Sequence, residues 1–148
     1  MKIIKLIKGK YYNLTEGLSN LIKWLPVIWN DRDFDQAYLY RILHKKLSFM
    51  EKFFRSERTY SANAPEVAEE IMEAKELLYN IIDGSRVKKV DFKFDEFISF
   101  NNDKLNFNTD NENYKIWSEG MDRAEQQEAE DMKRAFEIIS EKSQGWWD

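Results

Sequence analysis

Three long stretches of the chain carry apolar residues at helical spacing, and each stretch places one charged residue inside its apolar stripe. The stretches span about 35–58, 65–83 and 112–142, and the charged residues are Lys46, Glu70 and Glu128. Because removing an isolated charge from water costs several kcal/mol, a charge in a core has to be paired. The three charges are therefore predicted to meet inside the fold.

Helices of this length, joined by short loops, predict a mainly α chain that forms a bundle of about four helices. Residues 1–148 are expected to form a single domain, and a short first helix over 14–29 is ended or kinked at Pro26. Apolar and charged residues partly alternate within 86–113, which predicts an insertion in the bundle. This insertion is either a small β-hairpin, pairing 90–100 with 104–108, or an irregular segment, and the hairpin is favoured.

Two more acids belong to the predicted polar cluster. Asp35 projects along nearly the same line as Lys46, and Asp131 lies at the edge of the stripe that holds Glu128. One interpretation of the whole set is a structural ion pair that fixes the helix register. The other is a polar ligand-binding pocket, since helical bundles often build such sites from facing helices.

Carboxylates also recur three residues apart, at 66 and 69, at 70 and 73, and at 128 and 131. Such pairs can hold Mg²⁺, and their spacing is similar to that of the paired acids in the all-α nucleotide pyrophosphatases. That resemblance implies an alternative function, a Mg²⁺-dependent nucleotide hydrolase. Apart from this alternative, no cofactor or metal is expected. With no cysteine and a single histidine, His44, no catalytic set can be assembled, so an enzyme is not favoured.

Cations gather on the outer face of the second long helix, at Arg41, Lys45, Lys52 and Arg55. Residues 1–64 carry 12 Lys/Arg against 6 Asp/Glu, whereas residues 65–148 carry 11 against 21. The simpler interpretation is that the basic and acidic helices pack together, and the functional one is a basic surface for a small anionic ligand. A net charge of −4 does not favour nucleic acid as a partner.

Trp146 and Trp147 follow Gly145 at the end of the sequence. They are expected to close the open end of the bundle near Trp24 and Trp29. The alternative is an exposed aromatic anchor for a partner. No window approaches 18 uninterrupted apolar residues, so no membrane partner is expected.

Three short motifs stand out in the sequence: WNDRDFD at 29–35, KLxxM at 46–50 and WWD at 146–148. Together they resemble a family of small uncharacterised proteins of tailed phages. The family has no established activity, so the resemblance brings no catalytic residues. It implies a place of action in the cytoplasm of an infected bacterium, and small phage proteins of this kind often act by binding, including as inhibitors of host defence.

The leading hypothesis is a non-enzymatic phage protein that sequesters a small anionic, nucleotide-like ligand or blocks a host defence protein. The Mg²⁺-dependent hydrolase is one alternative, and a structural or assembly protein of the virion is another. The sequence leaves an oligomer open.

Overall fold

The computed structural model describes residues 2–90, 97–101 and 104–147, and the side chains of these residues except 2–10, 100 and 101. Its helices are α1 (Lys2–Ile28), α2 (Ala37–Phe54), α3 (Ala64–Asp83) and α4 (Glu112–Lys142), with short 3₁₀ turns η1 (Val87–Lys89) and η3 (Gly145–Trp147). The strands β1 (Ile98–Asn101) and β2 (Lys104–Phe107) form one antiparallel pair. The prediction of a mainly α bundle with a small β-hairpin is confirmed.

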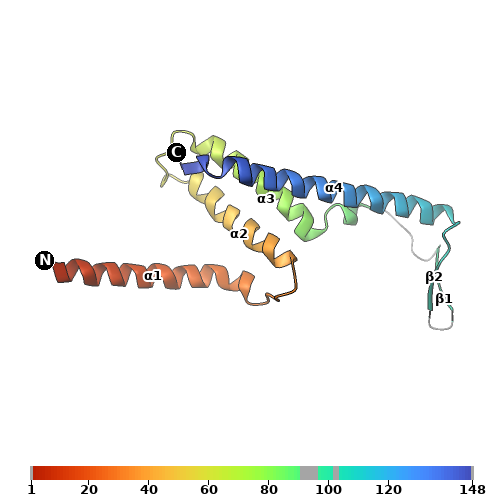
Figure 1. Ribbon diagram of the computed structural model, residues 1–148, viewed down its shortest axis with the longest axis horizontal. Helices are drawn as coiled ribbons and strands as arrows, with labels where there is room; N and C mark the ends of the chain where they lie inside the picture. The colour runs from red at the N-terminus through yellow and green to blue at the C-terminus, as the bar shows by residue number, and fades with distance from the viewer. Residues whose placement is uncertain (1, 91–96, 102–103, 148) are drawn as a thin grey trace.

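The core lies where α3 packs against both α2 and α4 (Figure 1). The side chains of Ala68, Ile71, Ala74 and Leu78 form the continuous buried stripe of α3. This stripe repeats every three or four residues, so one face of α3 is covered along most of its length. Leu47 and Phe54 contribute from α2, and Ala135 and Ile138 contribute from α4.

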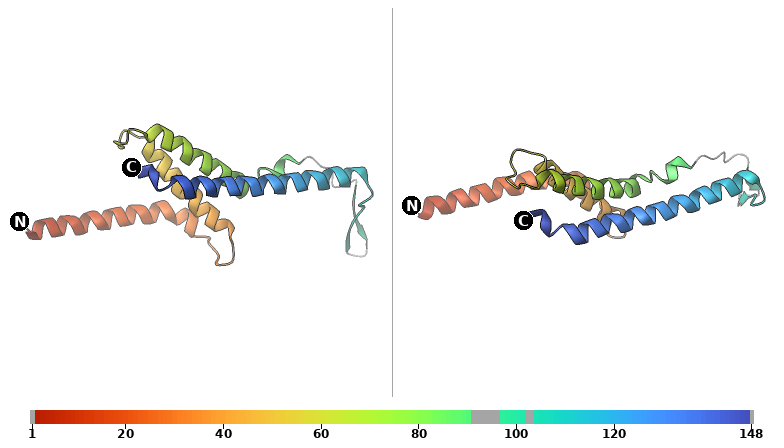
Figure 2. Two further views of the ribbon diagram at one scale, coloured as in Figure 1. Left: turned by 45° about the horizontal axis from the view of Figure 1, so that its top comes forward. Right: turned by 90° about the horizontal axis from the view of Figure 1, so that it is seen from above.

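Helix α1 is longer than predicted and is placed differently. It begins at Lys2 rather than near residue 15, and Pro26 is accommodated in its last turn, where the helix is about to end. Its principal contact is with α2, and beyond that contact it runs clear of α3 and α4 (Figures 1 and 2). The third and fourth helices therefore form the bundle with α2, and α1 lies beside it.

The hairpin sits at the far end of α4 from the carboxy terminus (Figure 1). Ile98 pairs with Phe107, and Asn101 pairs with Lys104, so the two strands run antiparallel. The first strand begins at Ile98 and not at residue 90, and residues 91–96 of the predicted strand lie outside the described residues. Phe97 anchors the hairpin, because its buried ring packs against Tyr114 and Trp117 of α4.

The end of α3 turns the chain back toward α4. Gly84 adopts a left-handed conformation (φ 61°), and the backbone N–H of Ser85 donates to the carbonyl of Asn80 at 2.9 Å. This is a Schellman cap, which favours glycine at the left-handed position. Beyond η1, Val90 packs so close to α4 that a Cβ on Gly120 would lie 2.7 Å from Val90 Cγ1. The cap thus holds the following residues, including Arg86, against α4.

Candidate ligand-binding site

The predicted polar cluster does not form around Lys46. The Lys46 side chain is exposed, and it faces a hollow between α1 and α2 rather than the core. The reason is helix geometry. Leu47 is the residue of this turn that α3 covers, and it lies about 100° round the helix from Lys46. The prediction that Lys46 is a buried partner of Glu70 and Glu128 was therefore wrong.

Asp131 is the acid that is buried, with 7% of its surface exposed. The guanidinium of Arg86 donates to both of its carboxylate oxygens at 2.9 Å, and the Asn80 side-chain amide adds a bond of 3.2 Å. Hydrogen bonding to Asp131 raises the pKa of Arg86, and the negative charge of Glu128 adds to this effect. Sequence patterning placed Asp131 correctly at the stripe's edge but missed Arg86, which follows α3 outside any helical stripe.

The other predicted members of the cluster each have different partners. Glu70 is half-buried and accepts a hydrogen bond of 3.0 Å from the indole N–H of Trp146, with the Lys142 ammonium 3.4 Å away. Asp35 lies just before α2, and its side chain accepts a hydrogen bond of 2.9 Å from the backbone N–H of Ala37, the first residue of that helix. The cluster is therefore a set of separate structural contacts, with only Glu128 and Asp131 near the same cation.

The carboxylate pairs proposed for Mg²⁺ are engaged by cations of the chain itself. Glu69 pairs with Arg55, Glu73 pairs with Arg134, and Asp131 pairs with Arg86. Within the described part of the chain, no three acidic or histidine side chains converge in a way that could hold a metal ion. The geometry therefore gives no support to the hydrolase alternative.

The predicted basic face of α2 is divided between three environments. Arg55 is neutralised, because it pairs with Glu51 and Glu69 at 3.0 Å each. The Arg41 guanidinium lies 4.8 Å from the ring centre of Tyr38, and the Lys45 ammonium lies 5.1 Å from that of Phe49. Lys52 alone of the four lines the hollow that Lys46 faces. Basic α2 does pack on acidic α3, as expected, and Glu51 binds Lys75 of α3 across this contact.

A hollow between α1 and α2 has a strongly basic lining. Its volume is about 630 Å³, and four cations from three segments contribute to its wall. We call it the basic hollow, and its lining residues are Asn20, Lys23, Trp24, Lys46, Phe49, Lys52, Phe53, Ser56 and Arg58. None of these lining residues is acidic. Trp24 and Phe49 meet edge to face, 5.5 Å between ring centres, and join the two helices beneath the cations.

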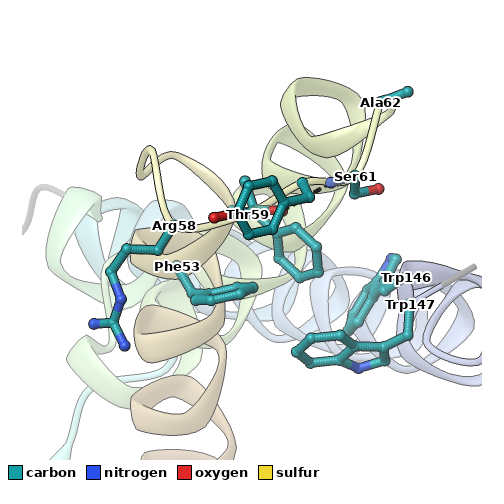
Figure 3. A pocket seen from close by; sticks show the side chains of 9 residues that line it. Phe53, Arg58, Thr59, Ser61, Ala62, Trp146 and Trp147 are labelled. Atoms are coloured by element: carbon teal, nitrogen blue, oxygen red, sulfur yellow. Dashed lines mark hydrogen bonds between the residues drawn. The ribbon is translucent and has the colours of Figure 1, made fainter.

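A second hollow of about 430 Å³ shares Phe53 and Arg58 with the basic hollow. We call it the aromatic hollow, and it is lined by Phe53, Phe54, Arg58, Thr59, Tyr60, Ser61, Ala62, Trp146 and Trp147. Figure 3 shows Phe53 between Arg58 on one side and the two tryptophans on the other. The two hollows therefore adjoin, and Phe53 and Arg58 belong to both.

The carboxy-terminal tryptophans build one wall of the aromatic hollow. Trp146 is buried in the core, whereas Trp147 is 65% exposed and lies 5.8 Å and 5.3 Å from the ring centres of Phe53 and Phe54. They do not pack around Trp24 and Trp29 as expected, because α4 ends beside the carboxy end of α2 and not beside α1 (Figure 1). Trp146 does pack on an end of the bundle, as expected, but beside the carboxy end of α2 and not near Trp24 and Trp29.

His44 lies on another side of α2, near Tyr79 of α3. Partial burial lowers the pKa of His44, and the positive charges of Lys75 and Lys45 lower it further. The imidazole of His44 therefore stays neutral down to a lower pH than the imidazole of a free histidine does. It takes no part in either hollow.

Comparison with known protein families, with curated proteins and with solved structures finds no significant match. Among the described residues, no helix combines the length and apolar character needed to cross a membrane. The case for a function therefore depends on the two hollows. Sequence reasoning found Lys46 and Lys52 but missed Lys23 and Trp24 as site residues, because they belong to α1, which only the fold brings beside α2.

Proposed function

We propose that this chain is a non-enzymatic binding protein whose ligand is a small anion of nucleotide type. The observation that supports this proposal best is the convergence of four cations in the basic hollow with no acid among its described lining residues. Like charges gathered on a concave surface repel one another, and a bound anion relieves that repulsion. The hollow has the size of ordinary small-molecule sites.

The adjoining aromatic hollow indicates what else the ligand carries. Bases stack on exposed aromatic rings, and such stacking contributes about 1–3 kcal/mol per base. Trp147 and Phe53 offer ring surface on one side of Arg58, and the lysines lie on the other. A ligand with phosphates in the basic hollow and a base against Trp147 would use both compartments.

A binding role fits these hollows better than catalysis. The groups in them are ammonium and guanidinium cations, aromatic rings and a few hydroxyls. General acid–base catalysis needs a group that can exchange a proton near neutral pH, and His44 is not in either hollow. Sequestration without turnover follows from a site that binds charge but lacks such a group.

The phage setting is part of this proposal and rests on the motif resemblance alone. In that setting the protein would act in the cytoplasm of an infected bacterium, by removing a free nucleotide-like compound. A protein that instead blocks a host defence protein would retain a protein partner and no nucleotide.

The test is isothermal titration calorimetry with nucleoside mono-, di- and triphosphates, inorganic triphosphate and an unphosphorylated nucleoside. We expect nucleoside polyphosphates to bind with an affinity that falls as salt is raised. The variants Lys46→Gln and Lys52→Gln should each weaken binding about tenfold, the value of one charge-assisted contact. Lys133→Gln is the matched control, because Lys133 is an exposed lysine of α4 far from the basic hollow in the sequence.

The proposal fails if none of these compounds binds at millimolar concentration, or if Lys133→Gln weakens binding as much as Lys46→Gln. Nucleotide hydrolysis by the purified protein would overturn the non-enzymatic part. Because Lys46 and Lys52 are both exposed, neither Lys46→Gln nor Lys52→Gln should change the melting temperature in the absence of ligand.

A further inference from the structure

Helix α1 carries a row of large apolar side chains that the described residues of its own chain leave exposed. Among its described side chains the row consists of Tyr11, Leu14, Leu18, Leu21, Leu25 and Ile28, each between 40% and 70% exposed. Isolated apolar residues on a surface are ordinary, but a contiguous row along one helix marks an interaction surface.

The row points away from the contact that α1 makes with α2. The residues of α1 that are partly covered include Trp24 and Val27, and Trp24 meets Phe49 of α2. On a helical projection these two residues lie at least 100° from the direction of Leu18 and Leu25. The contact with α2 nevertheless leaves each of the six side chains of the row at least 40% exposed, and the amino-terminal part of α1 runs clear of α3 and α4 (Figure 2).

The spacing of the row is that of a coiled coil. Its members alternate in steps of three and four residues, and the sequence continues the alternation backward to Ile7 and Ile4. The apolar positions 4, 7, 11, 14, 18, 21, 25 and 28 thus fill every core position of three and a half heptads. A repeat of 3.5 residues keeps one seam facing a partner helix along its full length, and that partner is another helix of similar length.

Charge decides how two copies of α1 would lie. Four of the five lysines of α1 fall within its first nine residues, and its only acid is Glu16. A parallel pair would place both lysine-rich ends together. An antiparallel pair would separate them by about 40 Å, the length of the helix, which far exceeds the Debye length of about 8 Å at physiological salt.

The heptad positions also fit an antiparallel register. If Leu14 faces Leu18 of a second copy, then Tyr11 faces Leu21, and the same register brings sequence position 7 opposite 25 and position 4 opposite 28. Every apolar core position then meets another one, and the two-fold axis passes beside Glu16. Because the basic hollow uses the opposite side of α1, pairing leaves it open.

We infer that α1 is a dimerisation helix, which pairs in antiparallel coiled-coil fashion with α1 of a second copy of this chain. This inference is independent of the proposed ligand. It accounts for an exposed apolar row that a monomer would leave in water.

Sedimentation equilibrium of the full chain tests the pairing. We expect the wild-type protein to be a dimer at micromolar concentration, and Leu18→Glu to be a monomer. Both residue 18 and the control position Asn13 are exposed, so neither change should unfold a subunit. Asn13→Glu adds the same charge outside the row and should leave the dimer intact. If the wild-type protein is still a monomer at about 100 μM, the inference is overturned. A dimer that survives Leu18→Glu also overturns it.

Cross-linking tests the direction, which the absence of native cysteine makes simple. In the antiparallel register, Tyr11→Cys chains mixed with Leu21→Cys chains should form a disulfide under oxidation, and neither variant should link to itself. Self-linking of each variant alone would show parallel pairing and overturn the arrangement. A protein that stays monomeric but sediments with anionic phospholipid vesicles at low salt would show that the row binds a lipid surface instead.

Discussion

Two ion pairs of this protein differ in how deeply they are buried and not in the distance between their charged atoms. The Arg86–Asp131 and Arg134–Glu73 pairs have the same nitrogen–oxygen separation, 2.9 Å. The side chain of Asp131 is 9% exposed, whereas both partners of the other pair are about half exposed, at 54% and 48%. An exposed pair gains little because water and salt screen it, but a buried acid that loses its partner is left uncompensated.

The two pairs therefore make a matched experiment. Arg86→Met should lower the free energy of unfolding by about 3 kcal/mol, because it leaves the Asp131 carboxylate buried with only Asn80 as a donor. Arg134→Met should cost less than about 1 kcal/mol. Urea unfolding of the two variants measures both values. Equal losses would contradict the difference in burial.

His44 predicts a specific pH dependence. Its pKa is lowered in the folded protein by partial burial and by nearby lysine charges, so the unfolded chain binds the proton more readily. The stability that depends on neutral His44 is fully present above its ordinary pKa of about 6.5 and is lost as pH falls toward the lowered value.

Melting temperatures of the wild type and His44→Gln, measured from about pH 8 to about pH 5.5, test this dependence. The wild type should lose stability relative to the variant below about pH 6.5 and run parallel to it above about pH 7. If the two curves stay parallel over the whole range, the histidine is not perturbed.

At the scale of single elements, the sequence predicted the structure well where residues close to one another in the chain determine it. The predicted stretch 65–83 matches α3, which has Asn63 at its N-cap, Pro65 in its first turn and Gly84 at its C-cap. The length of α1 was missed because Gly9 and Gly17, with the lysines among its apolar residues, weakened the helical signal at its start. The burial of Lys46 was mispredicted because periodicity gives the direction of an apolar arc but not which part a neighbour covers.

Gly84, which ends α3, allows a direct test of a helix boundary. Its φ of 61° disfavours any residue with a Cβ, so Gly84→Ala should destabilise the fold by about 1 kcal/mol. Gly84→Asn should cost less, because asparagine tolerates the left-handed region better than alanine does. Chemical denaturation of both variants gives the order, and a reversed order would show that the cap relaxes on substitution.

At the scale of the whole molecule, the fold class followed from the sequence but the candidate site did not. Apolar periodicity predicted three packed helices, and the partial alternation of apolar and charged residues predicted the hairpin. The two hollows combine α1, α2, the 58–62 loop and the carboxy-terminal turn. No sequence pattern says that these four segments meet, because their contacts depend on how the helices cross.

The two tryptophans should separate stability from binding. Trp146→Ala should lower the free energy of unfolding by about 3–5 kcal/mol, as expected for a buried aromatic residue of the core. Trp147→Ala should leave stability nearly unchanged, because its ring is mostly exposed, while weakening nucleotide binding at the aromatic hollow. Thermal melts and calorimetry on both variants distinguish the roles. Equal thermal losses would mean that Trp147 supports the core as well.

The docking of Trp146 has a consequence for synthesis on the ribosome. The indole of Trp146 completes a core whose other members lie between Leu47 and Ile138, and it bonds to Glu70, 76 residues earlier in the chain. A nascent chain that has already delivered α2 and α3 to the outside still lacks α4 and this last side chain. The apolar stripe of α3 therefore stays only partly covered until residue 146 has left the ribosome, and exposed apolar surface of this kind makes a nascent chain prone to aggregation.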